Sequence, residues 1–394
     1  MGQECGQVLA INPGTTSTKF GIFTRAGQVL ARNIHHGDDE IQRFKGRPML
    51  DRLAYRAELI EKALAESGFT PKGKGAEPWA AVAGRGGLLP PMEFGTYLVD
   101  DAMVEELRLA RRGEHASNLG AVLALRFAQA AGVNAYIVDP VTADEWQPCA
   151  RYSGSPLAER SYVGHSLNTK AVARRYARSL GRSYASLKLI VIHMGSGVTV
   201  SAHREGRMID SNSIEEGPFG PDRTGSLPVR ALVKLCCSGT MTEAELDRHV
   251  FGDGGLYAYL GTRDLIEVER RIESGDGGAG APETGQPGAA AVFEAMIYQI
   301  AKEAGSMAAV LQGKVDAVLV TGGMAHSERA VARLREYVEW IAPVKVYPGE
   351  DELEALAEGV FRVLDGEEEA KRIKAGNRDQ GTGSRKTGIG GLGT

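Results

Sequence analysis

Cysteine is scarce in this sequence of 394 residues, and the spacing of the few cysteines excludes the usual cysteine-based architectures. Cys5, Cys149, Cys236 and Cys237 form no CxxC pair, and two adjacent cysteines are poorly spaced to hold zinc. We therefore expect no disulfide framework, and a reducing compartment fits best.

Long apolar runs and an excess of one charge are also missing. No run approaches the roughly 18–20 apolar residues that span a bilayer, and residues 1–6 lack the basic-then-apolar order of a secretory signal. With 46 Lys and Arg against 50 Asp and Glu, the net charge is −4, which gives no bulk reason to expect nucleic acid or an anionic membrane. We expect a soluble cytoplasmic protein with neither partner.

Several familiar ligand motifs are absent as well. There is no Walker A pattern, no GxGxxG after an apolar strand, and no HExxH, which disfavours a zinc hydrolase. Instead, Gly-bearing turns follow four apolar strands, at residues 12–19, 84–87, 193–197 and 322–324. Ligands bind beyond the strand ends of open α/β sheets, so these turns would build a nucleotide-phosphate cradle if they converge. Each turn alone is more typical of an ordinary loop.

The first of these turns carries the clearest chemistry. Residues 8–11 and 20–23 are short apolar runs, and Pro13-Gly14 between them indicates a tight turn. Four hydroxyl side chains and Lys19 follow, with no acidic residue among them. Backbone N–H groups, hydroxyls and an ammonium are what a phosphate needs. The alternative is a polar β-hairpin at a sheet edge.

Apolar strands alternate with helical patterns, which indicates an α/β fold. Strands are expected at 80–83, 135–138, 187–192, 198–202, 315–321 and 344–347, and helices at 51–67, 116–131, 168–180, 289–311, 327–341 and 351–364. Residues 187–202 repeat the strand, turn, strand order of residues 8–23. Together with the length, this favours two domains of related topology that face each other across a cleft. Residues 275–288 are expected to form a flexible insert, and residues after Gly366 a disordered tail.

Two arginines lie in Gly-rich surroundings that favour anion binding. Arg85 is part of Gly-Arg-Gly-Gly, and Arg223 is part of the segment 217–225. Neighbouring glycines let an anion reach the guanidinium and the backbone amides together, and the planar guanidinium suits carboxylate and phosphoryl oxygens. The alternative for both is a surface arginine in a loop.

Other polar residues have two interpretations. Asp139 follows a buried strand and could hold a magnesium-linked water, or cap the turn before Pro140. His165 precedes a helix and could stabilise a phosphoryl group or cap that helix. His193 ends a core strand and could be structural. Residues 350–352 are acidic at a helix start, where the macrodipole favours them, but one carboxylate could instead help to hold magnesium.

Taken together, these motifs resemble those of the acetate and butyrate kinase family, within the superfamily of sugar kinases, heat-shock chaperones and actin. Residues 12–19 resemble the first phosphate motif, 84–87 the substrate-arginine motif, 193–197 the second phosphate motif, 215–225 a long signature, 321–324 the adenosine motif and 349–359 a motif near the end. The resemblance covers about residues 7–365, in order. Pro13, Thr18 and the form of residues 84–87 are closer to the butyrate branch.

The resemblance implies a duplicated actin-like or ribonuclease H-like α/β fold of two domains with a cleft between them. Residues 1–160 and a returning helix at 350–366 would form the first domain, 161–349 the nucleotide-binding domain, and 367–394 the tail. Relatives of this fold pair as dimers or larger rings, so a homo-oligomer is expected.

Carried over residue by residue, the resemblance also implies a site. Catalytic roles fall to Arg223, Arg85, His165 and Asp139, and a metal contact falls to Asp351, although Glu350 or Glu352 could serve instead. The expected ATP- and ADP-binding residues are Asn12, Thr15, Ser17, Lys19, His193, Gly195, Ser196, Gly197, Gly322, Gly323 and Met324.

The implied reaction is reversible, magnesium-dependent transfer of the ATP γ-phosphoryl group to butyrate or a branched analogue. A carboxylate is ionised at neutral pH, so it needs no general base, and the site has only to bring two anions together. Acetate, propionate or a sugar hydroxyl remain alternative acceptors. A slow ATPase of the actin or chaperone type and a sugar-responsive repressor are further alternatives, but no added substrate domain is evident and no helix-turn-helix has room before Val8.

Overall fold

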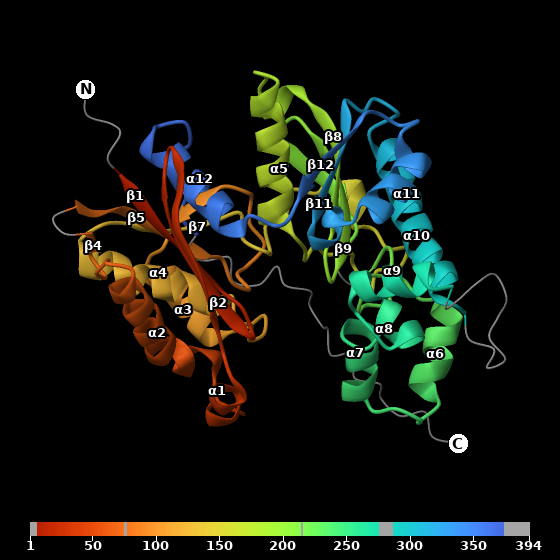
Figure 1. Ribbon diagram of the computed structural model, residues 1–394, viewed down its shortest axis with the longest axis horizontal. Helices are drawn as coiled ribbons and strands as arrows, with labels where there is room; N and C mark the ends of the chain where they lie inside the picture. Colours follow the sequence, from red (N-terminus) through yellow and green to blue (C-terminus); the bar gives the residue numbers. More distant parts are fainter. Residues whose placement is uncertain (1–5, 75–76, 214–215, 276–286, 374–394) are drawn as a thin grey trace.

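The computed structural model describes residues 6–74, 77–213, 216–275 and 287–373. In this part the chain forms two mixed β-sheets, each with helices on both faces (Figure 1). The expected α/β fold with two related halves is confirmed, because the two sheets share one strand topology.

The first sheet has the strand order β3-β2-β1-β5-β7-β6, with β4 paired to β5. An antiparallel meander is followed by two strands that run parallel to β1. The strands are β1 (Gln7–Pro13), β2 (Ser17–Thr24), β3 (Gly27–His35), β4 (Gly73–Lys74), β5 (Glu77–Arg85), β6 (Thr96–Leu98) and β7 (Ala135–Val138).

The second sheet repeats this arrangement in the order β10-β9-β8-β11-β12, with β8 in the place of β1. Its strands are β8 (Lys188–Met194), β9 (Val198–Arg204), β10 (Arg207–Ser211), β11 (Ala317–Gly322) and β12 (Val344–Pro348). The central strand β8 is almost continuously apolar because both of its faces are covered, as in parallel sheets generally.

Alternate residues of the central strands point into two different cores. In β1, Leu9 and Ile11 pack with α4 (Asn118–Ala131), whereas Val8 and Ala10 pack with α12 (Glu352–Leu364). The second sheet packs likewise between α10 (Ala289–Val310) and α5 (Ser166–Ser179). Helices α5 and α12 therefore lie between the two sheets and contact each other (Figure 1). The outer layers also include α1 (Asp38–Arg43), α2 (Leu53–Glu66), α3 (Asp101–Leu109) and α11 (Glu328–Val338).

Four short helices follow the second meander in a stretch for which the sequence pattern predicts no element. They are α6 (Val229–Cys237), α7 (Glu243–Phe251), α8 (Gly255–Leu260) and α9 (Leu265–Glu273). Neither α6 nor α7 buries a residue, and the apolar residues Val229 and Val233 of α6 are exposed.

The chain beyond α12 is ordered for longer than expected. Residues assigned to the tail from 367 onward include Lys371, whose N–H donates to the Thr96 carbonyl and whose carbonyl accepts from the Leu98 N–H, each at 2.8 Å. Lys371 thus pairs with β6. The rest of the expected tail and residues 276–286 of the expected insert lie outside the described residues. Within the described part, no helix is long and apolar enough to cross a bilayer.

Candidate active site

The turn between β1 and β2 lies next to a pocket between the two halves. Asn12 is buried at the end of β1, while Thr15 and Lys19 are exposed. Lys19 lines a pocket of about 420 Å³ together with Gly323 and residues 349–354. Because Gly323 follows β11 of the second sheet, this pocket brings the first and fourth Gly-bearing turns together.

Arg85 enters the same region from the end of β5. A side chain on Gly84 would collide with the Gly120 carbonyl, so the two glycines let α4 approach the strand end closely. The Arg85 guanidinium forms an ion pair with Glu352, and the other Glu352 oxygen accepts a hydrogen bond from the Asn12 amide. Glu352 therefore joins two predicted ligand residues from different strands.

Arg223 lies against the second phosphate motif. A side chain on Gly197 would stand 2.6 Å from Arg223 Nη1, which explains why glycine is needed there. Both Nε and Nη1 of Arg223 are buried without a hydrogen-bond partner among the described residues, and the carboxylate of Asp222 is 3.8 Å from Nε. Burial lowers the pKa of Arg223 and raises that of Asp222. The arrangement leaves a cation with unused donors beside a phosphate-type turn.

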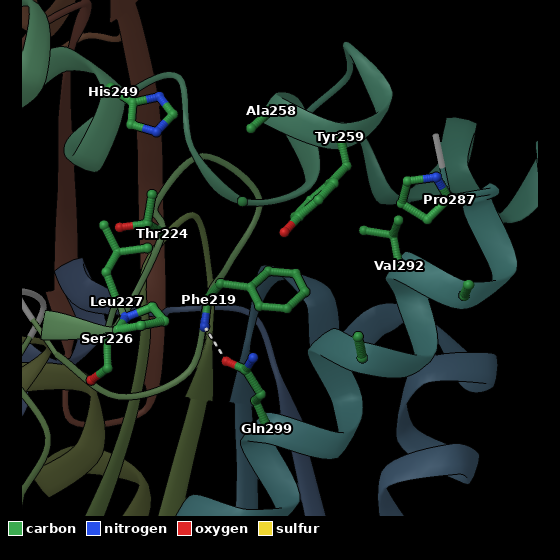
Figure 2. A pocket seen from close by; sticks show the side chains of 14 residues that line it. Phe219, Thr224, Ser226, Leu227, His249, Ala258, Tyr259, Pro287, Val292 and Gln299 are labelled. Atoms are coloured by element: carbon green, nitrogen blue, oxygen red, sulfur yellow. Dashed lines mark hydrogen bonds between the residues drawn. The ribbon is translucent and has the colours of Figure 1, made fainter. Parts of the chain in front are cut away.

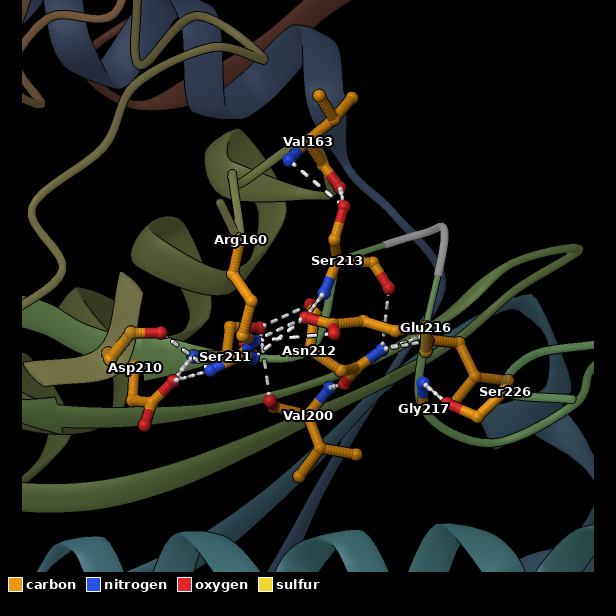
Figure 3. A network of polar contacts seen from close by, with 12 residues as sticks. Arg160, Val163, Val200, Asp210, Ser211, Asn212, Ser213, Glu216, Gly217 and Ser226 are labelled. Atoms are coloured by element: carbon orange, nitrogen blue, oxygen red, sulfur yellow. Dashed lines mark hydrogen bonds and ion pairs between the residues drawn. The ribbon is translucent and has the colours of Figure 1, made fainter. Parts of the chain in front are cut away.

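The loop that presents Arg223 is held at its start by a polar network (Figure 3). Arg160 donates to the Glu216 carboxylate at 2.7 Å and to the Ser211 carbonyl at 3.0 Å. Asn212 donates to the carbonyls of Val198 and Glu216 at 2.9 and 3.1 Å. No local sequence pattern marks this network, and Glu215 of the signature lies outside the described residues.

A second pocket, of about 540 Å³, borders the same loop (Figure 2). Its lining is mostly apolar and includes Phe219, Tyr259 and Val292. The Phe219 N–H donates to Gln299 of α10 at 3.2 Å. The loop is thus tied to the long helix on the outer face of the second sheet.

Two histidines stack between the halves. The rings of His165 and His193 are parallel within 11°, with centroids 3.8 Å apart. Asn168 holds His193 Nδ1 at 2.9 Å through its amide oxygen and donates its N–H to the Glu350 carbonyl, also at 2.9 Å. The pKa of His165 lies well below its ordinary value. Burial is the largest cause, and electrostatic interactions with His193, Arg223 and Arg85 lower the pKa further. His165 makes no side-chain cap on α5, so the capping alternative does not hold.

The three acidic residues at the start of α12 point in different directions. Glu350 lies 3.5 Å from His193 Nε2, and this contact, with Lys19 and Arg85, lowers the pKa of Glu350. Asp351 is half-exposed and forms an ion pair with Arg175 of α5 at 3.0 Å. Asp351 also lines the pocket that contains Lys19, so its assignment to the metal stays a prediction. The alternatives Glu350 and Glu352 have carboxylates that contact predicted ligand residues directly.

Both oxygens of the Asp139 carboxylate are already engaged by the protein. One oxygen accepts from the Gly95 N–H at 2.8 Å and the other from Arg174 of α5 at 2.7 Å. Burial by itself raises its pKa, but the charges of Arg174, Lys170 and Arg362 outweigh burial and lower it. The carboxylate therefore links β7 to α5, and the role expected for it at the phosphoryl group stays a prediction.

The adenosine motif is joined to the acidic segment by the backbone. Gly322 and Gly349 exchange two N–H···O bonds of 3.0 and 3.1 Å, and the Thr321 hydroxyl also donates to the Gly349 carbonyl. Gly322 has a φ of +92°, and a side chain there would collide with the Met194 carbonyl. Gly323 and Met324 begin the 3-10 turn Gly323–His326 that follows, so the third and fourth turns are in contact.

The described residues hold no group of three or more His, Cys, Asp or Glu side chains that could cage a metal. Magnesium is usually held by one or two carboxylates with substrate phosphates and water, and it needs no such cage. The Glu352 carboxylate, held by Asn12 and Arg85 next to the hydroxyl-bearing turn, fits that requirement.

Comparison with known proteins agrees with this geometry. Residues 152–342 match the profile of the acetokinase family. The acetate kinase of Porphyromonas gingivalis has a TM-score of 0.73 at 17% identity, covering 91% of this chain and 100% of its own. The acetate kinase of Entamoeba histolytica has a TM-score of 0.72 at 15% identity, and the match covers 91% of this chain and 100% of that one. A propionate kinase of Francisella tularensis has a TM-score of 0.66 at 16% identity, and the match covers 90% of this chain and 98% of that one. The chain is therefore similar to the acetokinase family over residues 152–342 and shares the two-sheet fold of these kinases.

Proposed function

We propose that this chain reversibly transfers the γ-phosphoryl group of ATP to a short-chain carboxylate, giving ADP and an acyl phosphate. The observation that carries the proposal is the guanidinium of Arg223 beside Gly197, two of whose nitrogens have no hydrogen-bond partner among the described residues. A buried donor without a partner costs about 1–3 kcal/mol, which an incoming anion recovers. The acetokinase-family match over residues 152–342 supports the same chemistry.

The site suits a reaction between two anions. The carboxylate acceptor is ionised at neutral pH and attacks without a general base. Arg85 and Arg223 would neutralise and align the acceptor and the transferring phosphoryl group, which is the main catalytic task in phosphoryl transfer. His165 is neutral at pH 7 because of its lowered pKa, so it would act as a hydrogen-bond donor rather than as a charge.

ATP would be held by residues of both halves, with Lys19, Thr15 and Ser17 at the phosphates and residues 322–324 at the adenosine. Magnesium would enter with ATP and supply charge neutralisation of the phosphate oxygens. We assign its protein contact to Glu352, with Asn12 fixing the orientation of that carboxylate.

We further propose butyrate or a branched four- to five-carbon acid as the preferred acceptor. Pro13, Thr18 and the Gly-Arg-Gly-Gly form of residues 84–87 support this choice. The structural relatives named above are acetate and propionate kinases, so those smaller acids are the second candidates.

Trapping of acyl phosphate with hydroxylamine tests both levels of the proposal. Purified protein would be incubated with Mg-ATP and acetate, propionate, butyrate, isobutyrate or isovalerate. Highest kcat/KM with four- or five-carbon acids is the expected result, and a preference for acetate would overturn the acceptor assignment. No hydroxamate with any acid, in a protein that still binds ATP, would refute the transferase function and favour an actin- or chaperone-type ATPase.

A further inference from the structure

A buried charged cluster lies directly behind the β1–β2 turn. It consists of Arg56 on α2, Glu40 on α1, and His36 and Thr18 of the first meander; we call it the turn clamp. Arg56 is fully buried, and its Nε donates to Glu40 at 3.1 Å. His36 Nδ1 lies 2.5 Å from the other Glu40 oxygen, and its Nε2 lies 2.8 Å from the Thr18 hydroxyl.

Residues of the turn clamp donate hydrogen bonds to three successive carbonyl groups of the turn. Arg56 donates to the Gly14 carbonyl at 2.7 Å and to the Thr15 carbonyl at 3.4 Å. The backbone N–H of His36 donates to the Thr16 carbonyl at 2.9 Å. The carbonyls of the turn are therefore drawn toward α2 and away from the opposite side.

The direction of these carbonyls fixes the direction of the N–H groups. In a planar trans peptide the C=O and N–H bonds point in opposite directions, and the described chain has no cis peptide. The N–H groups of Thr15 and Thr16 therefore point away from Arg56, and the N–H of Ser17 points away from the backbone of His36. Successive N–H groups that face one side form an anion-binding concavity.

The clamp also shows which hydroxyl of the turn is unavailable to a ligand. Thr18 is buried and lies 3.4 Å from Arg56 Nη1 in addition to its contact with His36. Burial is the largest cause that lowers the pKa of His36, followed by the charge of Arg56. The cationic end of the turn clamp, Arg56, touches the turn.

We propose that Arg56 is a positioning residue that shapes the β1–β2 turn to receive the β- and γ-phosphates of the nucleotide. This inference rests on the proposed function, from which it takes the identity of the ligand. The binding of a nucleoside diphosphate can nevertheless be measured without the carboxylate substrate. Arg56 acts through the turn and makes no contact with the ligand.

The test compares Arg56→Lys, which keeps the charge but cannot span two carbonyls and Glu40, with Thr18→Val, which removes one clamp contact at nearly constant volume. Arg25→Met is the matched control, because Arg25 follows the other end of β2 and pairs with Asp365. ADP affinity would be measured calorimetrically, and KM for Mg-ATP and for the carboxylate kinetically, on variants whose circular dichroism matches the parent.

Arg56→Lys should weaken ADP binding and raise the KM for Mg-ATP by about tenfold or more, because a misplacement of about 1 Å at the site can cause a loss of that size. The KM for the carboxylate should stay within about twofold of the parent value. Thr18→Val should have a smaller effect in the same direction and decides the test if Arg56→Lys does not fold. Unchanged ADP affinity in the folded variants, or an equal loss in Arg25→Met, would overturn the proposal. Failure of the transferase function alone would leave the ADP result standing, so the two proposals fail separately.

Discussion

His165 and His193 lie with their rings stacked at 3.8 Å, one from the loop before α5 and the other from the end of β8. Two cationic rings at this distance would repel each other, and Arg223 and Arg85 add further positive charge nearby. The stack therefore requires at least one neutral imidazole. The lowered pKa of His165 identifies it as the neutral ring.

Replacement of His165 should change the rate but leave its pH dependence unaltered. We expect His165→Asn, which keeps a hydrogen-bond donor, to lose about tenfold in kcat, and His165→Ala to lose about 10²-fold or more. Because the pKa of His165 lies well below its ordinary value, the kcat profile from about pH 6 to 8 should keep its shape in both variants. Initial rates across that range provide the check, and the disappearance of an acidic limb in His165→Asn would contradict the neutral assignment.

The framework of the fold was well predicted by the sequence. Strand β7 lies at the predicted residues 135–138, and β8, α5 and α10 agree with their predicted ranges within two residues at each end. Strands β7 and β8 are nearly continuous apolar runs, and α5 and α10 have apolar residues at helical spacing, so their patterns could be recognised. By contrast, α6 and α7 bury nothing. Helix α6 has apolar residues at helical spacing but is only nine residues long, which is short for a prediction from periodicity.

The site was predicted less completely, for a different physical reason. The glycines and arginines of the turns could be recognised because their residue types are unusual in such places. Which acidic residue faces the turn depends on how α12 begins, and Asp351 adopts a left-handed φ of +35° there. Arg56 and Asn168 act through contacts with segments far away in the sequence, so no local pattern marks them.

Glu352 and Asp351 should behave very differently although they are neighbours. We expect Glu352→Gln to lose about 10²-fold in kcat and to need more magnesium for half-maximal rate, because it removes the charge beside Asn12 and Arg85. Asp351→Asn should stay within about threefold, since an exposed ion pair with Arg175 contributes little. Magnesium titrations of both variants decide the matter. A larger loss in Asp351→Asn would restore the assignment made from the sequence.

Asp139 should matter chiefly for stability. Asp139→Asn leaves Arg174 without its partner between β7 and α5, which should cost about 3 kcal/mol in the free energy of unfolding. The pKa of Asp139 is lowered in the fold, so its contribution is complete above the unfolded value near 4 and is lost as pH falls below it. Urea unfolding at pH 7 and at about pH 2.5, below the unfolded value, measures both effects. A stable variant with activity reduced more than about tenfold would return Asp139 to a catalytic role.

His203 should make the fold sensitive to mild acid. Its ring is fully buried between the Tyr184 hydroxyl at 2.6 Å and the Ser201 hydroxyl at 2.7 Å, and burial lowers its pKa well below the ordinary value. The unfolded chain binds the proton first, so stability falls by about 1.4 kcal/mol per pH unit below roughly 6.5. His203→Gln should be less stable at pH 7.5 but lose less on acidification to pH 5.5, as measured by urea midpoints. Parallel losses in the parent and the variant would refute this account.

Asn168 should be needed for rate, because its side chain joins His193 to the backbone of the segment before α12. Its amide oxygen accepts from His193 Nδ1, which directs Nε2 toward Glu350, and its amide nitrogen fixes the Glu350 carbonyl. Asn168→Leu fills the same buried space without either bond, so we expect kcat to fall about 10- to 100-fold. Asn168→Asp keeps the acceptor for His193 but not the donor to Glu350.

The two Asn168 variants separate the two contacts. If the orientation of His193 is what matters, Asn168→Asp should recover most of the rate, and if the position of the 349–352 segment matters, it should remain as slow as Asn168→Leu. The steady-state kcat of both variants distinguishes these two cases, provided that their melting temperatures stay close to that of the parent. Full activity in Asn168→Leu would mean that neither contact positions a reacting group, and the pairing of His193 with Glu350 would then be structural only.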